Sequence, residues 1–159
     1  MQLKVKRLTE TAVLPVKAHP TDAGFDICAD ENIRIDAGET VTVSTGLSIA
    51  IPEGYYGRLK GRSGLTAKTP LRVQEGTIDA SYRGEMKVIC ELRAVSVDIQ
   101  LFDTPYEARS AVFTRNYTIN QDQRIAQLII QPLPTVEVEE VDELDDTDRG
   151  DGGFGSTGI

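Results

Sequence analysis

Alternation of apolar and polar residues along short segments is the feature that most constrains the fold of this chain. Six segments alternate with a period close to two residues, and Gly, Pro, Asn and Asp stand between them. A period of two puts successive side chains on opposite faces of a β-strand, whereas an amphipathic helix needs a period of about 3.6. Strands are therefore predicted within residues 3–8, 33–51, 57–62, 86–101, 110–119 and 124–133.

Many short strands separated by closely spaced turns predict an all-β protein. The 159 residues are enough for one domain with one hydrophobic core. We predict a single-domain, jelly-roll-like β-barrel or sandwich, because that topology covers the edges of its sheets. Helix is expected for one or two turns at most, and the best candidate follows Gly61 and spans residues 63–68.

Charge divides the chain into a body and an arm. Residues 1–136 hold sixteen acids and sixteen bases, whereas residues 137–148 hold eight acids and no base. We predict a β domain over 1–136 and a flexible, acidic and then glycine-rich arm over 137–159, with one more strand-like piece at 135–141. A neutral body with an acidic arm argues against direct nucleic-acid binding, because nonspecific duplex binding needs a net basic surface.

The sequence carries no sign of export or membrane insertion. No run approaches the roughly 18 apolar residues of a transmembrane helix, and the N-terminal "MQLKVKRLTE" lacks the apolar block of a signal peptide. Cys28 and Cys90 lack the spacing of a metal site, so we expect both to be reduced and buried. A cytoplasmic protein without a membrane partner is therefore expected.

The first candidate for an anion site is the segment 54–74, which contains five bases and no acid. Arg58, Lys60 and Arg62 share one face if residues 58–62 form a strand. The amides of Ser63 and Gly64 follow where a helical turn begins, and amides, a hydroxyl and guanidinium groups together suit phosphate oxygens. The alternative is a solvated basic strand face.

Two acidic stretches are candidates for chemistry beside such an anion. In "EGTIDASYRGE", the Asp79 carboxylate is suited to take a proton from an attacking water, and the Tyr82 ring to press on a sugar and exclude a 2'-hydroxyl. In "TDAGFDICA", Asp22 or Asp26 is suited to hold Mg2+ through its waters. The alternatives are ordinary turn-forming carboxylates and a half-buried aromatic.

The C-terminal "RGDGGFGSTGI" is too rich in glycine to pack by itself, yet it carries the side chains that grip a flat, charged ligand. Phe154 is suited to stack on a base, and Arg149, Ser156 and Thr157 are suited to hold phosphate. Ordering a segment costs roughly 1–2 kcal/mol per residue in backbone entropy, so we expect this lid to close only on a bound ligand.

Five segments in order resemble the motifs of the trimeric dUTP diphosphatase (dUTPase) family: "AGFDI", "GRSGL", "GTIDASYRGE", "RIAQLII" and "RGDGGFGSTG". The resemblance spans residues 23–158. It implies a jelly-roll β fold and a homotrimer with active sites at the subunit interfaces. It also implies Mg2+-dependent hydrolysis of dUTP to dUMP and pyrophosphate.

The resemblance also assigns roles to residues of this chain. Asp79 would be the general base for attack of water on the α-phosphorus, Tyr82 would lie against the deoxyribose, and Asp26 would reach the metal through water. The residues implied to bind phosphate are Arg62, Ser63, Gly64 and Gln127. Those implied to read uracil are Gly76, Thr77 and Ile78, with Lys87 as a further candidate. Those of the arm are Arg149, Phe154, Gly155, Ser156 and Thr157.

The chain also departs from the family pattern, and other functions stay open. Ser81 stands where the third motif often has a second acid, Val73 lies close to where a polar residue assists uracil recognition, and a surface insertion is predicted within 93–118. One alternative is a dCTP deaminase, or a bifunctional deaminase and diphosphatase, with Glu75 or Glu85 as its acid and base. Another is an interaction protein that dUTP switches.

Overall fold

The computed structural model describes residues 2–94 and 116–152, and almost all of its regular structure is β-strand. The strands are β1 (Lys4–Arg7), β2 (Phe25–Cys28), β3 (Ile33–Asp36), β4 (Thr40–Ser44), β5 (Leu47–Ala50), β6 (Tyr55–Gly61), β7 (Leu71–Val73), β8 (Gly76–Ile78), β9 (Lys87–Leu92), β10 (Asn116–Ile119) and β11 (Arg124–Pro132). The one helix of the described residues is α1 (Ser63–Lys68). The predicted all-β class and the predicted short helix are both confirmed.

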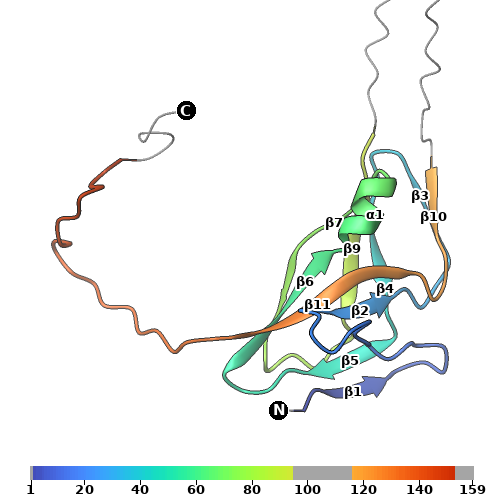
Figure 1. Ribbon diagram of the computed structural model, residues 1–159, viewed down its shortest axis with the longest axis horizontal. Coiled ribbons are helices and arrows are strands. Elements are labelled where there is room, and N and C mark those ends of the chain that lie inside the picture. The colour runs from blue at the N-terminus through green and yellow to red at the C-terminus, as the bar shows by residue number, and fades with distance from the viewer. Residues whose placement is uncertain (1, 95–115, 153–159) are drawn as a thin grey trace, which may run out of the picture.

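The described strands form four small antiparallel sheets that surround one interior. The largest has the order β2-β11-β6-β8, so β11 lies between β2 and β6, and β8 is an edge strand. The others are β4-β9-β7, β1-β5 and β10-β3. β6 leads into α1 at one end of the body, while β1 and β5 lie at the other end (Figure 1).

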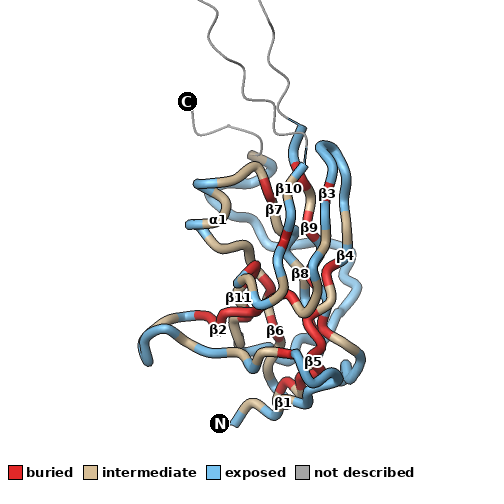
Figure 2. The backbone as a smooth tube through the Cα atoms, turned by 90° about the vertical axis from the view of Figure 1, so that its right-hand side faces the viewer, coloured by how far each residue is buried: buried red, intermediate tan, exposed pale blue. Residues whose placement is uncertain are grey.

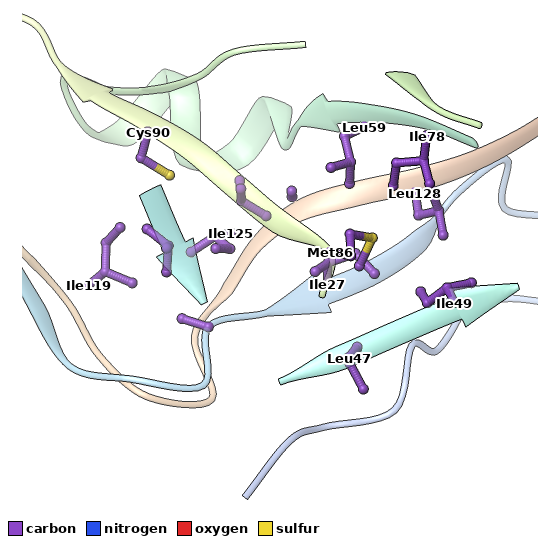
Figure 3. Packing of buried hydrophobic residues seen from close by; sticks show 14 of the residues in the cluster. Ile27, Leu47, Ile49, Leu59, Ile78, Met86, Cys90, Ile119, Ile125 and Leu128 are labelled. Atoms are coloured by element: carbon purple, nitrogen blue, oxygen red, sulfur yellow. The ribbon is translucent and has the colours of Figure 1, made fainter. Parts of the chain in front are cut away.

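One hydrophobic core holds these sheets together. Alternation decides which side chains enter it: in β9, Val88, Cys90 and Leu92 are buried, whereas Lys87 and Ile89 are exposed. Strands from different sheets contribute to the same cluster, as Figure 3 shows for residues of β2, β5, β9 and β11. Buried stretches accordingly lie in the middle of the body and exposed loops at its margins (Figure 2).

Both cysteines are free and buried, as predicted. Burial raises the pKa of the Cys90 thiol to about 12. This thiol is therefore protonated at neutral pH and packs as a small apolar side chain.

The chain leaves the body after β11. The Leu133 amide still donates to the Gly54 carbonyl at 2.8 Å, but residues 133–151 are exposed and the chain beyond Leu133 runs away from the sheets (Figure 1). The prediction of a strand at 135–141 is wrong for the single chain, because no neighbouring strand of the described residues accepts its hydrogen bonds. Val136 and Val138 are accordingly 76% and 98% exposed.

Some predictions fall on other parts of the chain. Phe154, Gly155, Ser156 and Thr157 lie outside the described residues, as does 95–115, which makes up most of the insertion predicted within 93–118. Residues 116–118 belong to β10, which pairs with β3. Within 2–94 and 116–152, no helix is long and apolar enough to cross a bilayer.

Candidate active site

The residues predicted to bind a nucleotide divide between two cavities of this chain. The first, which we call the arginine cleft, has a volume of about 560 Å3 and is lined by Arg62, Ser63, Gly64, Leu65, Lys68, Thr69, Gln123, Arg124 and Gln127. The second, the Asp79 pocket, has a volume of about 550 Å3 and is lined by Thr42, Leu59, Gly76, Thr77, Ile78, Asp79, Tyr82, Glu85, Met86, Lys87 and Ile89.

Asp26 organises the wall of the arginine cleft. This carboxylate is only 5% exposed, and its Oδ1 lies 3.1 Å from Nε of Arg62 and accepts from Nε2 of Gln127 at 3.3 Å. Its Oδ2 accepts from Nη1 of Arg124 at 3.2 Å. A buried carboxylate needs such partners, so Asp26 holds two guanidinium groups and one amide in defined positions.

A β-bulge in β11 brings Arg124 and Gln127 to the same side. Residues three apart in a regular strand point to opposite faces. The register of β11 against β2 shifts here, because Arg124 pairs with Cys28 while Ala126 already pairs with Ile27. The extra residue re-aims the strand, and both side chains then face Asp26.

The start of α1 supplies the backbone groups of the cleft. Arg62 is the N-cap residue, and its carbonyl accepts from the amides of Leu65 and Thr66. The amides of Ser63 and Gly64 precede these and have no partner within a helix, so they are available to an anion. The cleft thus combines two guanidinium groups, a hydroxyl and free amides.

The basic face predicted on β6 does not act as one unit. Nη2 of Arg58 lies 2.6 Å and Nζ of Lys60 lies 3.4 Å from the Glu75 carboxylate. The hydrogen bond from Arg58 is the main reason why the pKa of Glu75 lies below its ordinary value. Of these three bases, only Arg62 belongs to the arginine cleft.

The Asp79 pocket forms where β8 ends. Asp79 follows Ile78 directly, and its carbonyl accepts from the Tyr82 amide at 3.1 Å, which closes a tight turn. Leu59, Ile78 and Met86 give the pocket buried apolar walls. The pocket therefore offers an exposed carboxylate and an aromatic ring beside an apolar surface.

Glu85 ties the loop after Asp79 to the turn between β4 and β5. Its Oε1 accepts from the Ser44 hydroxyl and, at 3.0 Å, from the Gly46 amide, and Nζ of Lys87 lies 3.6 Å from Oε2. Burial alone raises the pKa of Glu85, but these hydrogen bonds and the Lys87 ammonium outweigh burial, so the pKa lies below its ordinary 4.5. Ionised Glu85 thus stabilises the folded loop.

We expect Glu85→Gln to lower the free energy of unfolding at neutral pH. The difference from the parent protein, which we call the stability margin, is expected to shrink in acid. Because the folded-state pKa is lowered, the contribution of Glu85 is complete above the ordinary 4.5 and is lost as the pH falls through the folded-state value. Thermal unfolding between neutral pH and about pH 3 measures this margin. The exposed Glu53→Gln is the control, and a margin that does not change with pH would contradict the assignment.

The two cavities lie far apart on one chain. In the antiparallel pairing of β6 with β8, Gly57 lies opposite Ile78, so Asp79 comes level with Tyr56 near the start of β6, while Arg62 follows its end. Six residues of strand at about 3.3 Å each separate these positions by roughly 20 Å. A base must come within about 3 Å of the proton that it takes, so no small ligand brings Asp79 and Arg62 of the same chain together at one atom.

The side chains around the arginine cleft suit a metal ion that they contact through water, and not one that they ligate directly. Among residues 2–94 and 116–152, no three His, Cys, Asp or Glu side chains gather to hold an ion. Both oxygens of Asp26 are already engaged, because Oδ1 accepts from Gln127 and forms an ion pair with Arg62, and Oδ2 accepts from Arg124. This set fits Mg2+ that keeps its waters and takes phosphate oxygens as its main ligands.

Comparison with known proteins identifies the family of this chain. A family model described as dUTPase matches residues 10–100 and 111–158, which include all the cleft and pocket residues. The chain belongs to the dUTPase family. The resemblance of its five motifs is thereby confirmed, and the all-β fold agrees with it.

Individual relatives match along nearly the whole chain. The deoxyuridine 5'-triphosphate nucleotidohydrolase of Paramecium bursaria Chlorella virus 1 is 43% identical over 157 residues, which are 99% of this chain and 98% of that protein. A mutant dUTPase of Staphylococcus bacteriophage 80alpha, solved with dUpNHpp, has a TM-score of 0.85 at 33% identity, with 99% of each chain covered.

A third protein concerns the metal. A mutant dUTPase of phage phi11 of S. aureus, whose structure describes the coordination of a structural Mg(II) ion, has a TM-score of 0.76 at 32% identity. The match covers 90% of this chain and 98% of that one.

The structure adds cleft residues that the sequence analysis did not select. Arg124 is the first residue of the segment "RIAQLII", and its positive charge was the available signal, but its partner Asp26 lies 98 residues away in the sequence. Thr69 and Gln123 line the same cleft, as does Lys68, which is one of the five bases of the predicted anion segment 54–74 and lies in the last turn of α1. Of the departures from the family pattern, Val73 packs against the core and Ser81 is exposed, and neither lines the arginine cleft or the Asp79 pocket.

Proposed function

We propose that this chain hydrolyses dUTP to dUMP and pyrophosphate. Membership of the dUTPase family supports the substrate and the reaction. The observation that carries the proposal is the division of chemistry between the cavities. One holds the cations and amides that a triphosphate needs, and the other holds the carboxylate, ring and strand edge that a nucleoside and an attacking water need.

In this proposal the Asp79 pocket binds the nucleoside and activates the water. The carboxylate of Asp79 takes a proton from water as the water oxygen bonds to the α-phosphorus. The bond from that phosphorus to the bridging oxygen breaks, and pyrophosphate leaves. Uracil is read by main-chain groups of Gly76, Thr77 and Ile78, because β8 is an edge strand whose outer N–H and C=O groups have no strand beside them in the described chain.

The ring of Tyr82 covers the deoxyribose in this arrangement. A ring pressed against the sugar leaves no room for a 2'-hydroxyl, and this exclusion selects deoxyribonucleotides. Lys87 lines the same pocket, where its ammonium is held near Glu85 and adds positive charge beside the nucleotide.

The arginine cleft holds the phosphates. Arg62, Ser63 and the Gly64 amide donate to phosphate oxygens, and Gln127 donates to a phosphate or an ordered water. Asp26 would hold Mg2+ only through water, and the ion would supply positive charge to the phosphate oxygens. The ion pair with Asp26 keeps Arg62 in place before the nucleotide arrives.

We further propose that each active site combines neighbouring copies in a homotrimer. The separation of roughly 20 Å along one chain, from strand rise, supports a site that joins the Asp79 pocket of one copy to the arginine cleft of the next. The arm, with Arg149, Phe154, Gly155, Ser156 and Thr157, then closes over the base and the γ-phosphate. Two free, buried cysteines suit a cytoplasmic location.

Complementation tests the shared site. Asp79→Asn and Arg62→Ala are each expected to be inactive, but co-expression with two affinity tags yields mixed trimers. Each mixed trimer contains one site with both native groups, so we expect about one third of the turnover of the parent trimer. Asp79→Asn mixed with Asp79→Ala is the control. An inactive Asp79→Asn and Arg62→Ala mixture would show that both groups act from one chain.

A panel of dUTP, UTP, dTTP and dCTP with Mg2+, scored for pyrophosphate and for ammonia, tests the reaction itself. We expect dUTP to release pyrophosphate far faster than UTP, dTTP or dCTP, and none of the four to release ammonia. Ammonia released from dCTP would favour the deaminase alternative. The structure gives that alternative little support, because Glu75 and Glu85 both have lowered pKa values and are poor proton donors at neutral pH.

A further inference from the structure

The ring of Tyr82 lies directly over Gly84. A Cβ atom built on Gly84 would stand 2.6 Å from Cζ and 2.9 Å from Cε2 of Tyr82. Carbon atoms in contact prefer about 3.5–4.0 Å, so no side chain at position 84 is compatible with this ring position. The ring and the glycine therefore depend on each other.

Room for the ring, and not backbone geometry, accounts for glycine at position 84. The described glycines with positive φ are Gly38, Gly46, Gly54 and Gly150, and Gly84 is not one of them. An L-residue would thus fit its backbone without strain. The three nearest atoms that a Cβ would meet all belong to Tyr82.

The other contacts of Tyr82 leave its ring exposed to the pocket. Tyr82 is 45% exposed, and its hydroxyl donates to the Glu85 carbonyl at 2.9 Å. Glu85 is itself held by Ser44 and Gly46 through its carboxylate. This hydrogen bond therefore fixes the hydroxyl end of the Tyr82 side chain. The absence of a side chain on Gly84 sets how closely the ring approaches the loop.

We propose that Gly84 is a positioning residue for sugar selectivity, because it lets the Tyr82 ring lie at the depth where it excludes a 2'-hydroxyl. This inference rests on the proposed function, in which Tyr82 covers the deoxyribose. With a Cβ at position 84, the Tyr82 ring must move by about 1 Å to reach an ordinary contact distance from it. A displacement of this size changes the fit of deoxyribose and ribose to the pocket.

The test is the ratio of kcat/KM for dUTP to that for UTP in Gly84→Ala. We expect the ratio to fall roughly tenfold or more, because a misplacement of about 1 Å in an active site costs up to 10²-fold. Ser81→Ala, on the same loop and exposed, is the matched control and is expected to keep the parent ratio. In the Tyr82→Ala background, Gly84→Ala is expected to change nothing further, since the ring that it displaces is absent.

The outcomes separate this inference from the proposed function. An unchanged ratio in Gly84→Ala, or an equal fall in the Tyr82→Ala background, overturns the inference and leaves dUTP hydrolysis standing. Absence of dUTP hydrolysis by the parent enzyme overturns both. If Gly84→Ala fails to fold, the inference requires Tyr82→Ala to rescue folding in the double variant, and failure of that rescue overturns it.

Discussion

Asp79→Asn is expected to abolish pyrophosphate release from dUTP while leaving dUTP binding intact. Asparagine has nearly the shape of aspartate but accepts no proton from water, so turnover falls by the roughly 10²–10⁴-fold typical of a lost general base. Asp79 lies at an exposed turn after β8 and takes part in none of the ion pairs of the described chain, so the fold does not depend on its charge. Coupled pyrophosphate detection measures turnover, and calorimetry with dUTP measures binding.

A carboxylate of similar exposure serves as the control for this variant. Asp36 lies on β3 in an exposed ion pair with Arg34, outside both cavities, and Asp36→Asn is expected to keep full turnover. Full turnover in Asp79→Asn would remove Asp79 from the mechanism. Tight dUTP binding without turnover in the parent enzyme would instead favour the interaction protein that dUTP switches.

Truncation after Asp148 is the second large effect that we expect. Loss of residues 149–159 should lower kcat/KM for dUTP by roughly 10²-fold or more, because the truncation removes the groups that we propose to close over the base and the γ-phosphate. The temperature of unfolding should not change. Residues 132–151 are exposed, and the Arg149 guanidinium donates only to the nearby Gly152 carbonyl, so the truncation removes no core contact of the described chain.

A point variant separates the parts of the arm. Arg149→Ala in the full-length chain removes one guanidinium and keeps the aromatic ring and the hydroxyls, so we expect a smaller loss than in the truncated chain. Full activity of the truncated chain would refute the closing role of the arm. A truncated chain that unfolds earlier than the parent would show instead that the arm stabilises the fold.

The local chemistry of the sequence was enough to predict most of the fold. Period-two alternation located the strands that became β1, β3, β4, β5, β6, β9, β10 and β11, and a glycine after a strand located α1. It missed β2, β7 and β8, which are three or four residues long. β2 is also buried along most of its length, so it does not alternate, and such strands are recognised only by the partner that they pair with.

Which basic residues line the arginine cleft was harder to predict from the sequence than the motifs themselves. The basic face of β6 looked like one anion site, but Arg58 and Lys60 both pair with the carboxylate of Glu75, which the pairing of β6 with β8 brings beside them. Arg124 entered the cleft because a bulge in β11 turned it toward Asp26. Both outcomes depend on strand register, and register is a property of two distant segments that alternation in either one does not specify.

Sequence alone determined the β-class and the short helix after β6, and it selected the carboxylate, ring and guanidinium groups proposed for the site, because alternation and residue chemistry are local properties. Tertiary structure alone decided how these groups are distributed. By setting Ile78 opposite Gly57, it placed Asp79 and Arg62 at opposite ends of one strand. It also placed the Tyr82 ring over a glycine two residues away, where only the absence of a side chain leaves it room.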